Sequence, residues 1–342
     1  MQYYYSETYM TRLILTTDDS GAGCLKGIGL ADIVIWFGLR FTWGPLPSDA
    51  ELATLLEARS TKHGSPGSHW LDFIRSRHLE EIEGKNLGLI DLCERCETIE
   101  LWIDPEPNAQ LTLVWLLDYL RQHGKIALKL TLVQADVPIG NHPPEEVARW
   151  WLPAVKILDD HLEAANAAWQ AYRAPTPQDW FSLLSRDLSI LPHLRQAVVE
   201  LLEELPMRAT GLGATEMRML ELISAGDAHP FDVFPGYRKR NERRVFGYWE
   251  VGCLLDGLAH CPAPVVSGLD EGPFTLQMHD DGNRRERYKR SELKLTALGK
   301  AILAQTEDFS QHNPIHRWWG ITELTNDRLW RWDAANRALI AP

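Results

Sequence analysis

Long hydrophobic runs are absent from this sequence. Its most apolar stretches, residues 33–37 and 111–117, are far shorter than the roughly 18 residues that a membrane-spanning helix needs. The opening residues, MQYYYSETYM, lack the basic and apolar regions of a secretory signal. We therefore expect a cytoplasmic protein with no membrane role.

Cysteine is scarce, and positive charge is outweighed by negative charge. The five cysteines do not have the spacing of a disulfide framework, which favours a reducing compartment. The formal net charge of −12 disfavours indiscriminate binding to nucleic acid, because the average field of the protein repels a polyanion. A local basic patch can still override that average.

The sequence does contain enough apolar material for a globular protein. Hydrophobic residues make up 45% of 342 residues, and the length is typical of two or three domains. Residues 1–9 are interpreted as a frayed extension, and Met10, directly before the first apolar run, is an alternative start.

Residues 10–140 alternate apolar runs with helical patterns. Because strands that alternate with helices form mostly parallel sheets, we predict an α/β domain with about four mostly parallel strands, Rossmann-like in class. Ser48 and Glu51 form the sequence signature of a helix start. The expected strands are 12–17, 32–37, 98–103 and 126–133, and the expected helices are 24–30, 49–59, 68–83, 86–94 and 107–123.

The alternation of strand and helix patterns ends at the turn-rich segment PIGNHPP, near residue 140. Residues 141–206 are interpreted as a helical connector, with helices at 145–172, 177–184 and 192–205 and no strand pattern. Residues 207–342 are expected to form a winged-helix-like α+β domain. Its last part, LWRWDAANRALI, predicts a strand, a turn and a second strand.

The winged-helix prediction depends on one ordered pattern. Helices are expected at 215–224 and 248–260, followed by strands at 274–279 and 288–295 on either side of an Asp-Gly turn, which is a strong hairpin signal. The hairpin leads into a Leu-Thr-x-x-Gly motif that starts at Leu295 and resembles the end of the wing in many bacterial winged-helix regulators. Such folds place a helix in the major groove and the hairpin on the flanking backbone.

Two basic clusters accompany this pattern, one before the second helix and one around the hairpin tip. They comprise Arg238, Lys239, Arg240, Arg243, Arg244, Arg284, Arg285, Arg287, Lys289 and Arg290. The helix 248–260 argues against DNA reading, because it carries no Arg, Asn or Gln placed for base readout. Two interpretations remain: contact with nucleic acid through the basic hairpin, or a winged helix that packs or binds protein with its arginines solvated.

A second candidate site follows the first expected strand. Asp18, Asp19, Ser20, Gly21 and Gly23 form a strand-to-helix turn whose backbone amides could hold an anion. The pattern is neither GxGxxG nor a P-loop, and two aspartates repel phosphate unless a cation intervenes. The alternative is structural, with Asp19 or Ser20 as the helix N-cap.

The remaining patterns predict no chemistry. Cys93 and Cys96 form a CxxC pair without a second pair at zinc-ribbon spacing, and Pro314 separates His312 from His316. We therefore predict no metal and no cofactor. The tryptophans are interpreted as packing residues of helices and of a domain seam: Trp150, Trp151, Trp169, Trp180, Trp318, Trp319, Trp330 and Trp332.

Three segments carry a family resemblance: DSGAGCLK after the first strand, the turn GPL that starts at Gly44, and ELWIDPEPNAQLTLVWLLDYL. Together they resemble the bacterial family called domain of unknown function 1835. The chain from about Pro192 onward resembles its frequent companion, domain of unknown function 3658. The segment GLRFTW departs from the family pattern, which has an Asp near Leu39, and this leaves an acidic function of the loop without support. The family has no established activity, so the resemblance implies relatives without a mechanism.

The leading hypothesis is a non-enzymatic sensor or interaction protein whose winged-helix module contacts nucleic acid or another protein. The alternative is an enzyme or ligand-binding protein that holds a phosphate-bearing small molecule at the DDSGAG loop.

Overall fold

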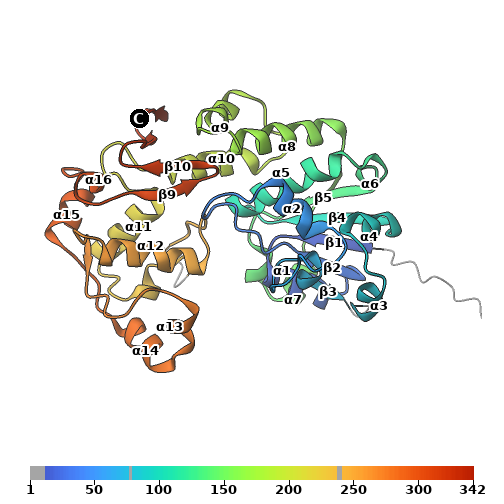
Figure 1. Cartoon of the computed structure of the whole chain (residues 1–342), viewed down its shortest axis with the longest axis horizontal. Helices are drawn as coiled ribbons and strands as arrows, with labels where there is room; N and C mark the ends of the chain where they lie inside the picture. The colour runs from blue at the N-terminus through green and yellow to red at the C-terminus, as the bar shows by residue number, and fades with distance from the viewer. Residues whose placement is uncertain (1–11, 77–78, 237–240) are drawn as a thin grey trace, which may run out of the picture. The chain divides into compact units, whose positions relative to one another are not determined.

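The structure, a computed structural model, describes residues 12–76, 79–236 and 241–342 (Figure 1). The chain divides into two compact units, which are described separately. The first comprises Met1–Phe41, Leu46–Gln170 and Asp187–Arg195, and the second comprises Thr42–Pro45, Ala171–Arg186 and Gln196–Pro342. Within the described ranges, every helix is too short or too polar to cross a membrane.

The first unit is built on a six-stranded mixed sheet of order β3-β2-β1-β4-β5-β6. Its strands are β1 (Arg12–Thr16), β2 (Ile33–Trp36), β3 (Ile74–Ser76), β4 (Thr98–Ile103), β5 (Leu130–Gln134) and β6 (Ala154–Lys156). The four inner strands β2, β1, β4 and β5 are parallel, and the edge strands β3 and β6 are antiparallel to their neighbours. The predicted α/β class with four parallel strands is confirmed, and the sequence pattern missed both edge strands.

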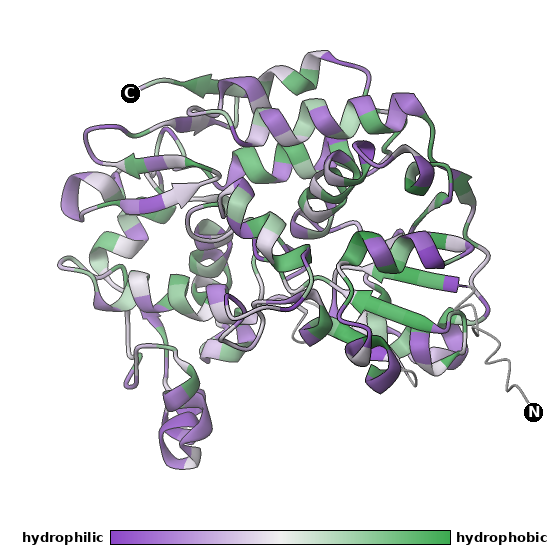
Figure 2. Ribbon diagram, turned by 45° about the vertical axis from the view of Figure 1, so that its right-hand side comes forward, coloured by the Kyte–Doolittle hydropathy of each residue, from purple (hydrophilic) through white to green (hydrophobic). Residues whose placement is uncertain are grey.

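The inner strands are apolar on both faces, as expected for parallel strands covered by helices. Ile14, Val34 and Val133 pack with apolar residues of α1 and α7 on one face. Gln134, one residue further along β5, bonds to Gln110 of α5, which therefore covers the opposite face. Figure 2 shows the inner strands of this sheet as mostly hydrophobic.

The helices of the first unit follow the predicted order with shifted ends. Ser48 and Glu51 form the predicted capping box at the start of α2. The helical segments are α1 (Asp19–Gly27), α2 (Asp49–Leu56), η1 (Trp70–Phe73), α3 (Leu79–Gly84), α4 (Leu89–Arg95), α5 (Pro107–Arg121), α6 (Gly124–Ala127), η2 (Ile139–Asn141), α7 (Pro144–Val147) and α8 (Asp159–Tyr172).

Three sequence expectations for this unit are wrong. Residues 68–83 are not one helix, because the 3-10 turn η1 ends where β3 begins to pair with β2. Residues 126–133 begin in α6, so the fourth parallel strand starts only at Leu130. The predicted helix 145–172 is interrupted by β6, which pairs with β5 directly after Pro153, a residue that cannot continue a helix ladder.

The second unit combines helices with small antiparallel pairs. Its helical segments are α9 (Gln178–Ser182), η3 (Leu183–Ser185), α10 (Leu194–Glu203), α11 (Ala214–Ser224), η4 (Pro230–Asp232), α12 (Tyr248–His260), α13 (Leu276–Asp280), α14 (Gly282–Arg290), α15 (Ala297–Leu303) and α16 (Phe309–His312). Its strands are β7 (Val266–Ser267), β8 (Lys294–Leu295), β9 (His316–Trp319), β10 (Thr322–Thr325), β11 (Arg331–Asp333) and β12 (Ala338–Ile340). The predicted C-terminal strand, turn and strand are confirmed as β11 and β12.

The predicted hairpin of residues 274–279 and 288–295 is wrong. Those residues form α13 and α14, and the Asp-Gly pair starts a helix because the Asp281 carboxylate accepts the amides of Asn283 and Arg284. A type I′ turn needs positive φ at both central residues, whereas Gly282 is the first residue of α14. The antiparallel pair in this region is β7 with β8, and α13 and α14 lie between its two strands in the chain.

Of the eight tryptophans interpreted as packing residues, four are buried, three are half-buried and one is exposed. Trp169 is buried in the first unit, and Trp180, Trp319 and Trp332 are buried in the second. Trp151, predicted to pack between helices, is 96% exposed, so that prediction is wrong. Residues 150–153 form no helix that could turn the ring inward.

Candidate functional site

The strand order of the first unit defines a topological switch point. From β1 the chain passes through α1 to β2 on one side, and β4 later pairs with β1 on the other side. In open α/β sheets, ligands bind outside the carboxyl ends of the strands at such a point. The residues that follow β1, β4 and β5 are therefore the first place to look for a site.

The turn after β1 is held by its own side chains. Asp18 is the N-cap of α1, and its Oδ2 accepts the amide of Gly21 at 2.7 Å. The turn therefore contains a helix N-cap, as the structural alternative predicted. The capping residue is Asp18, so the prediction of Asp19 or Ser20 as the cap is wrong. Asp19 instead pairs with Arg75, whose Nη2 lies 2.6 Å from Asp19 Oδ1.

Segment η2 covers the beginning of α1. A Cβ atom added to Gly140 would lie 2.5 Å from Asp18 Oδ2 and 2.6 Å from the Cβ of Ser20, so only glycine fits there. A Cβ atom added to Gly23, by contrast, would meet only the guanidinium of Arg75, at 3.9 Å. The predicted anion loop is thus occupied by Asp18 and closed by Gly140.

Three buried polar atoms lie at this same edge of the sheet without a hydrogen-bond partner among the described residues. They are Oγ1 of Thr16 and Thr17, at the end of β1, and Oε1 of Gln134, the last residue of β5. Thr16 is only 1% exposed. Leaving a buried polar atom unsatisfied costs about 1–3 kcal/mol, and native proteins retain few such atoms.

Side-chain amides of α5 hold the chain segments at the carboxyl edge of the sheet through hydrogen bonds. Asn108 accepts the Phe41 amide and donates to the Leu39 carbonyl, both at 2.8 Å, which secures the chain after β2. Gln110 Nε2 donates to the Asp104 carbonyl at 2.7 Å, after β4. Gln134 Nε2 donates to Gln110 Oε1 at 3.1 Å, at the end of β5.

These polar residues were missed by the sequence interpretation. Asn108, Gln110 and Thr112 are at most 7% exposed, although they alternate with apolar residues in the first half of a buried helix. The signal was present in the segment PNAQLT, because amides and hydroxyls in a helix that is apolar all round must find partners inside the protein.

The edge is rich in negative charge. Asp104 is 2% exposed, and its Oδ1 accepts the Ile139 amide at 2.9 Å. Asp136 is exposed and pairs with His193 at 3.6 Å. The carboxylates that follow β1, β4 and β5 are Asp18, Asp19, Asp104, Glu106 and Asp136.

In the second unit, the predicted basic residues are mostly tied to carboxylates. Arg284 and Arg287 both pair with Glu271, at 3.0 and 2.5 Å. Lys289 and Arg290 each lie 3.8 Å from Glu286. Arg285 is exposed, and Arg244 is half-buried. Arg238, Lys239 and Arg240 lie outside the described residues.

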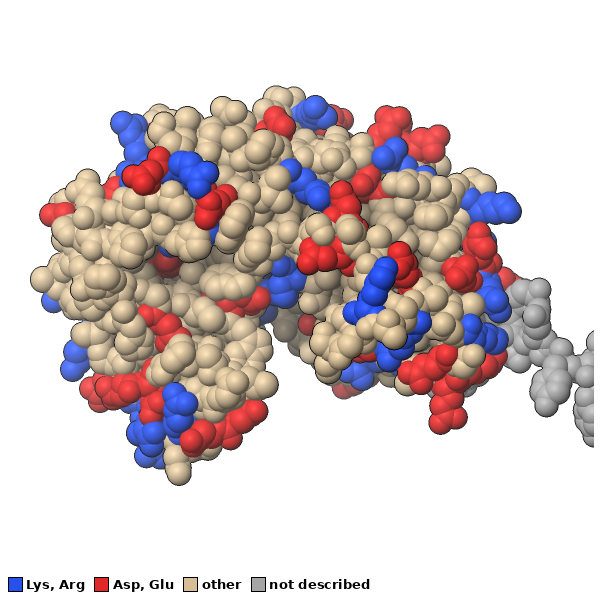
Figure 3. Space-filling view, viewed as in Figure 1, with Lys and Arg blue, Asp and Glu red and all other residues tan. Residues whose placement is uncertain are grey.

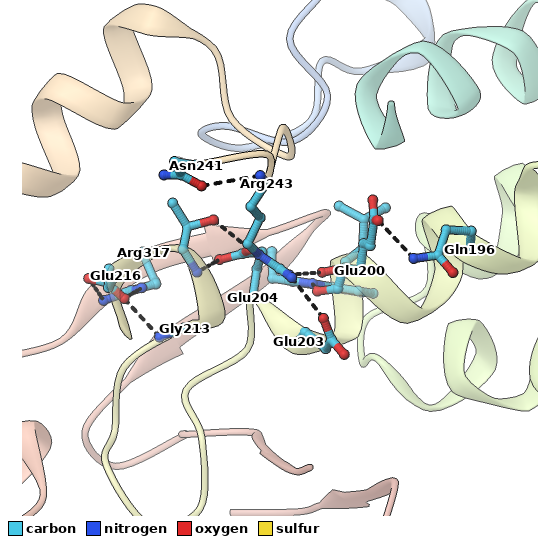
Figure 4. A network of polar contacts seen from close by, with 12 residues as sticks. Gln196, Glu200, Glu203, Glu204, Gly213, Glu216, Asn241, Arg243 and Arg317 are labelled. Atoms are coloured by element: carbon cyan, nitrogen blue, oxygen red, sulfur yellow. Dashed lines mark hydrogen bonds and ion pairs between the residues drawn. The ribbon is translucent and has the colours of Figure 1, made fainter. Parts of the chain in front are cut away.

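Arg243 faces the interior, so it does not belong to a surface patch. Its Nε lies 2.7 Å from Glu204 and its Nη1 lies 2.8 Å from Glu203 (Figure 4). Burial alone would lower the pKa of the Arg243 guanidinium, but these carboxylates together raise it. Burial raises the pKa of Glu204, against the opposing effects of Arg243 and Thr215.

The chain between β7 and β8 is close to neutral in charge. Figure 3 shows acidic and basic side chains interspersed over α13 and α14. Residues 268–293 carry Asp270, Glu271, Asp280, Asp281, Glu286 and Glu292 against Arg284, Arg285, Arg287, Lys289 and Arg290. A strongly attractive field for a polyanion does not arise from such a mixture.

No protein-family model and no curated protein matches this chain. The resemblance of its DSGAGCLK and GPL segments to a family of unknown function therefore stays a prediction.

Proposed function

We propose that the first unit binds a small polar molecule at the carboxyl edge of its sheet, and that the chain works as a ligand-binding sensor or interaction protein. The observation that carries this proposal is a set of buried atoms without a described partner at the carboxyl ends of two strands: those of Thr16 and Thr17 after β1, and that of Gln134 on β5, on the face of the sheet opposite to Thr16. Folding removes these atoms from water, which costs free energy, and a ligand that forms hydrogen bonds to them offsets that cost.

Binding is favoured over catalysis by the state of the neighbouring carboxylates. Asp18 accepts the Gly21 amide, and Asp104 accepts the Ile139 amide. Both carboxylates therefore already hold the chain in place, as groups that shape a site rather than as a free acid and base.

Thermal-shift screening followed by calorimetry tests the proposal. The screen contains nucleotides with and without Mg²⁺, amino acids, amines and sugars, because a ligand specific for the native state raises the melting temperature. We expect one class to bind, and we expect Thr16→Val and Thr17→Val to weaken it about tenfold each, the equivalent of one lost hydrogen bond.

Thr131→Val is the matched control, since Thr131 lies near the start of β5 rather than at the carboxyl edge. Equal binding by all three variants would remove the site from this edge. The absence of any ligand across the screen would remove the proposal itself.

A second candidate function has its own supporting observation. In the second unit, α11 and α12 are followed by the antiparallel pair β7 and β8, and β8 leads directly into α15, which Thr296 caps. We propose this order of elements as a winged-helix-like module, with the ribbon formed by β7 and β8 and with α14 carrying exposed cations.

Binding to mixed-sequence duplex DNA at low and moderate salt tests that candidate. Contact through α14 predicts a steep salt dependence that Arg285→Ala and Arg290→Ala reduce by about one unit each on a log–log plot. Arg328→Ala is the control, because Arg328 is an exposed arginine paired with Glu323, away from α14 in the sequence. Binding that is absent at low salt would refute the nucleic-acid function.

A further inference from the structure

The orientation of the Gln134 amide follows from the hydrogen bonds that hold it. The side chain of Gln110 has one donor group, its NH₂, and one acceptor atom, Oε1. The NH₂ group donates to the Asp104 carbonyl. Gln110 Oε1 must therefore receive a donor, which is Gln134 Nε2 at 3.1 Å. Exchanging the positions of Oε1 and Nε2 of Gln134 would place its Oε1 against Gln110 Oε1, and two acceptor oxygens repel each other. Gln134 thus presents its carbonyl oxygen, an acceptor, as the unpartnered atom.

The charge around this oxygen favours the same kind of ligand. Asp18 and Asp104 follow the two strands of the switch point, and Asp136 follows Gln134 by two residues. Among the described residues, Asp19 pairs with the guanidinium of Arg75, and Asp136 lies 3.6 Å from His193. Arg40 follows β2 at the same edge, so the five carboxylates named above outnumber the guanidinium groups of Arg40 and Arg75. An anionic ligand would be repelled here, and a cationic one attracted.

The beginning of α1 does not offset that charge. The amide of Gly21 already donates to Asp18, and Gly140 packs against the same turn. A phosphate at this helix terminus would therefore lie beside the Asp18 carboxylate, which already accepts the amide of Gly21.

We infer that the ligand of the first unit is a small hydrogen-bond donor of amine or guanidinium type, and that Gln134 Oε1 accepts one of its N–H groups. The inference rests on the proposed binding function of this edge and names the chemistry of its ligand. Gln110 is the positioning residue, because it determines which end of the Gln134 amide meets the ligand.

Calorimetry on the full chain with opposite probes tests the inference. The donor probes are putrescine and agmatine, and the acceptor probes are inorganic phosphate and AMP. We expect a donor probe to bind and the acceptor probes not to bind. Gln134→Leu should weaken the donor probe at least tenfold, whereas Gln122→Leu, at the C-cap of α5, should leave it unchanged.

A further variant separates positioning from general damage. Gln110→Leu releases the Gln134 amide, which can then present either its oxygen or its NH₂ group. We expect the preference for donor over acceptor probes to shrink at least fivefold, with the melting temperature of the unliganded protein as the check on folding. A merely structural role for Gln110 would lower both affinities equally and overturn this assignment.

The outcomes distinguish the two levels of the proposal. Binding of phosphate or AMP that depends on Thr16, with no binding of the amines, would overturn the donor inference and leave the binding function standing. Amine binding that survives Gln134→Leu would be nonspecific attraction to an acidic protein and would overturn the inference too. Failure of every probe and of the wider screen would overturn both.

Discussion

The two units each bury a polar network, and the two networks differ in how completely they are satisfied. In the second unit, Arg243, Glu203, Glu204 and Thr215 are bonded to one another, and Arg317 forms two bonds to Glu216. In the first unit, the neutral network of side-chain amides ends in the unpartnered Gln134 oxygen. The charged network is closed, whereas the neutral one has an open end.

The difference separates a structural network from a candidate site. A buried ion costs so much to leave unpaired that its partners must be supplied by the fold itself. A neutral hydroxyl or amide left without a partner costs far less, so a protein can retain it for a ligand. We therefore interpret the network around Arg243 as a clamp within the second unit, and the edge beside Gln134 as the place of binding.

The largest effect should come from breaking the closed network. Arg243→Ala leaves Glu204 buried and deprived of its guanidinium, and we expect a loss of about 3–5 kcal/mol in the free energy of unfolding. Urea denaturation monitored by circular dichroism measures it. Arg328→Ala, which removes an exposed partner of Glu323, should cost less than about 1 kcal/mol. Equal losses would mean that the network around Arg243 is no clamp.

A matched pair of threonines compares the networks directly. Thr16 and Thr215 are each 1% exposed, but Thr215 Oγ1 lies 2.7 Å from Glu204 Oε1 while Thr16 Oγ1 has no described partner. Thr215→Val should cost about 1.5–3 kcal/mol, the range for a hydrogen bond to a charged group. Thr16→Val should be neutral or stabilising, within about 1 kcal/mol. A comparable loss in both would show that Thr16 has a partner of its own.

The contact of Gly140 with the turn at the start of α1 can be tested in the first unit. Gly140→Ala places a methyl group against Asp18 and Ser20, and we expect a loss of about 1–3 kcal/mol from overpacking. Gly257→Ala is the control, because it lies inside α12 with no atom of another element within 4 Å. That change should stabilise the protein by about 0.5–1 kcal/mol through helix propensity. A harmless Gly140→Ala would mean that η2 does not close the turn.

The parallel sheet could be predicted from the sequence because short apolar runs such as RLILT and TIELWI are typical of strands that are buried on both faces. It failed where two local structures compete. The Asp-Gly pair at Asp281 fits a hairpin turn or a helix cap equally well, and tertiary contacts, including the pairing of Arg284 and Arg287 with Glu271, accompany the helix.

The candidate site was only half visible in the sequence. The loop after β1 was identified from its aspartates and glycines, but the amides that give the edge its chemistry come from α5 and β5, far along the chain. Spacing within a segment cannot reveal that Gln110 and Gln134 meet, because their contact is made by the pairing of β4 with β5 and the packing of α5 on the sheet.

The smallest expected effect concerns a closed neutral network in the first unit, around His69. This residue is fully buried; its Nδ1 accepts the Leu71 amide at 3.1 Å, and its Nε2 lies 2.9 Å from the Glu57 carbonyl. Burial lowers the pKa of His69, with His63 and Arg59 adding to the effect while the Glu57 carbonyl and Asp72 oppose it. Completeness of bonding, rather than location in one unit or the other, should decide whether such a network stabilises.

The sign of the resulting pH dependence follows from linkage. Because the folded-state pKa of His69 lies below its unfolded value, the unfolded chain binds the proton first as the pH falls. Stability should therefore be complete above about pH 6.5 and decline below it, until the folded-state pKa is passed. Urea denaturation at about pH 7.5 and 5.5 should give a shallower decline for His69→Gln than for the parent, while His123→Gln should follow the parent. Parallel curves for all three proteins would assign the acid sensitivity to other groups and leave the His69 network without a measurable share in stability.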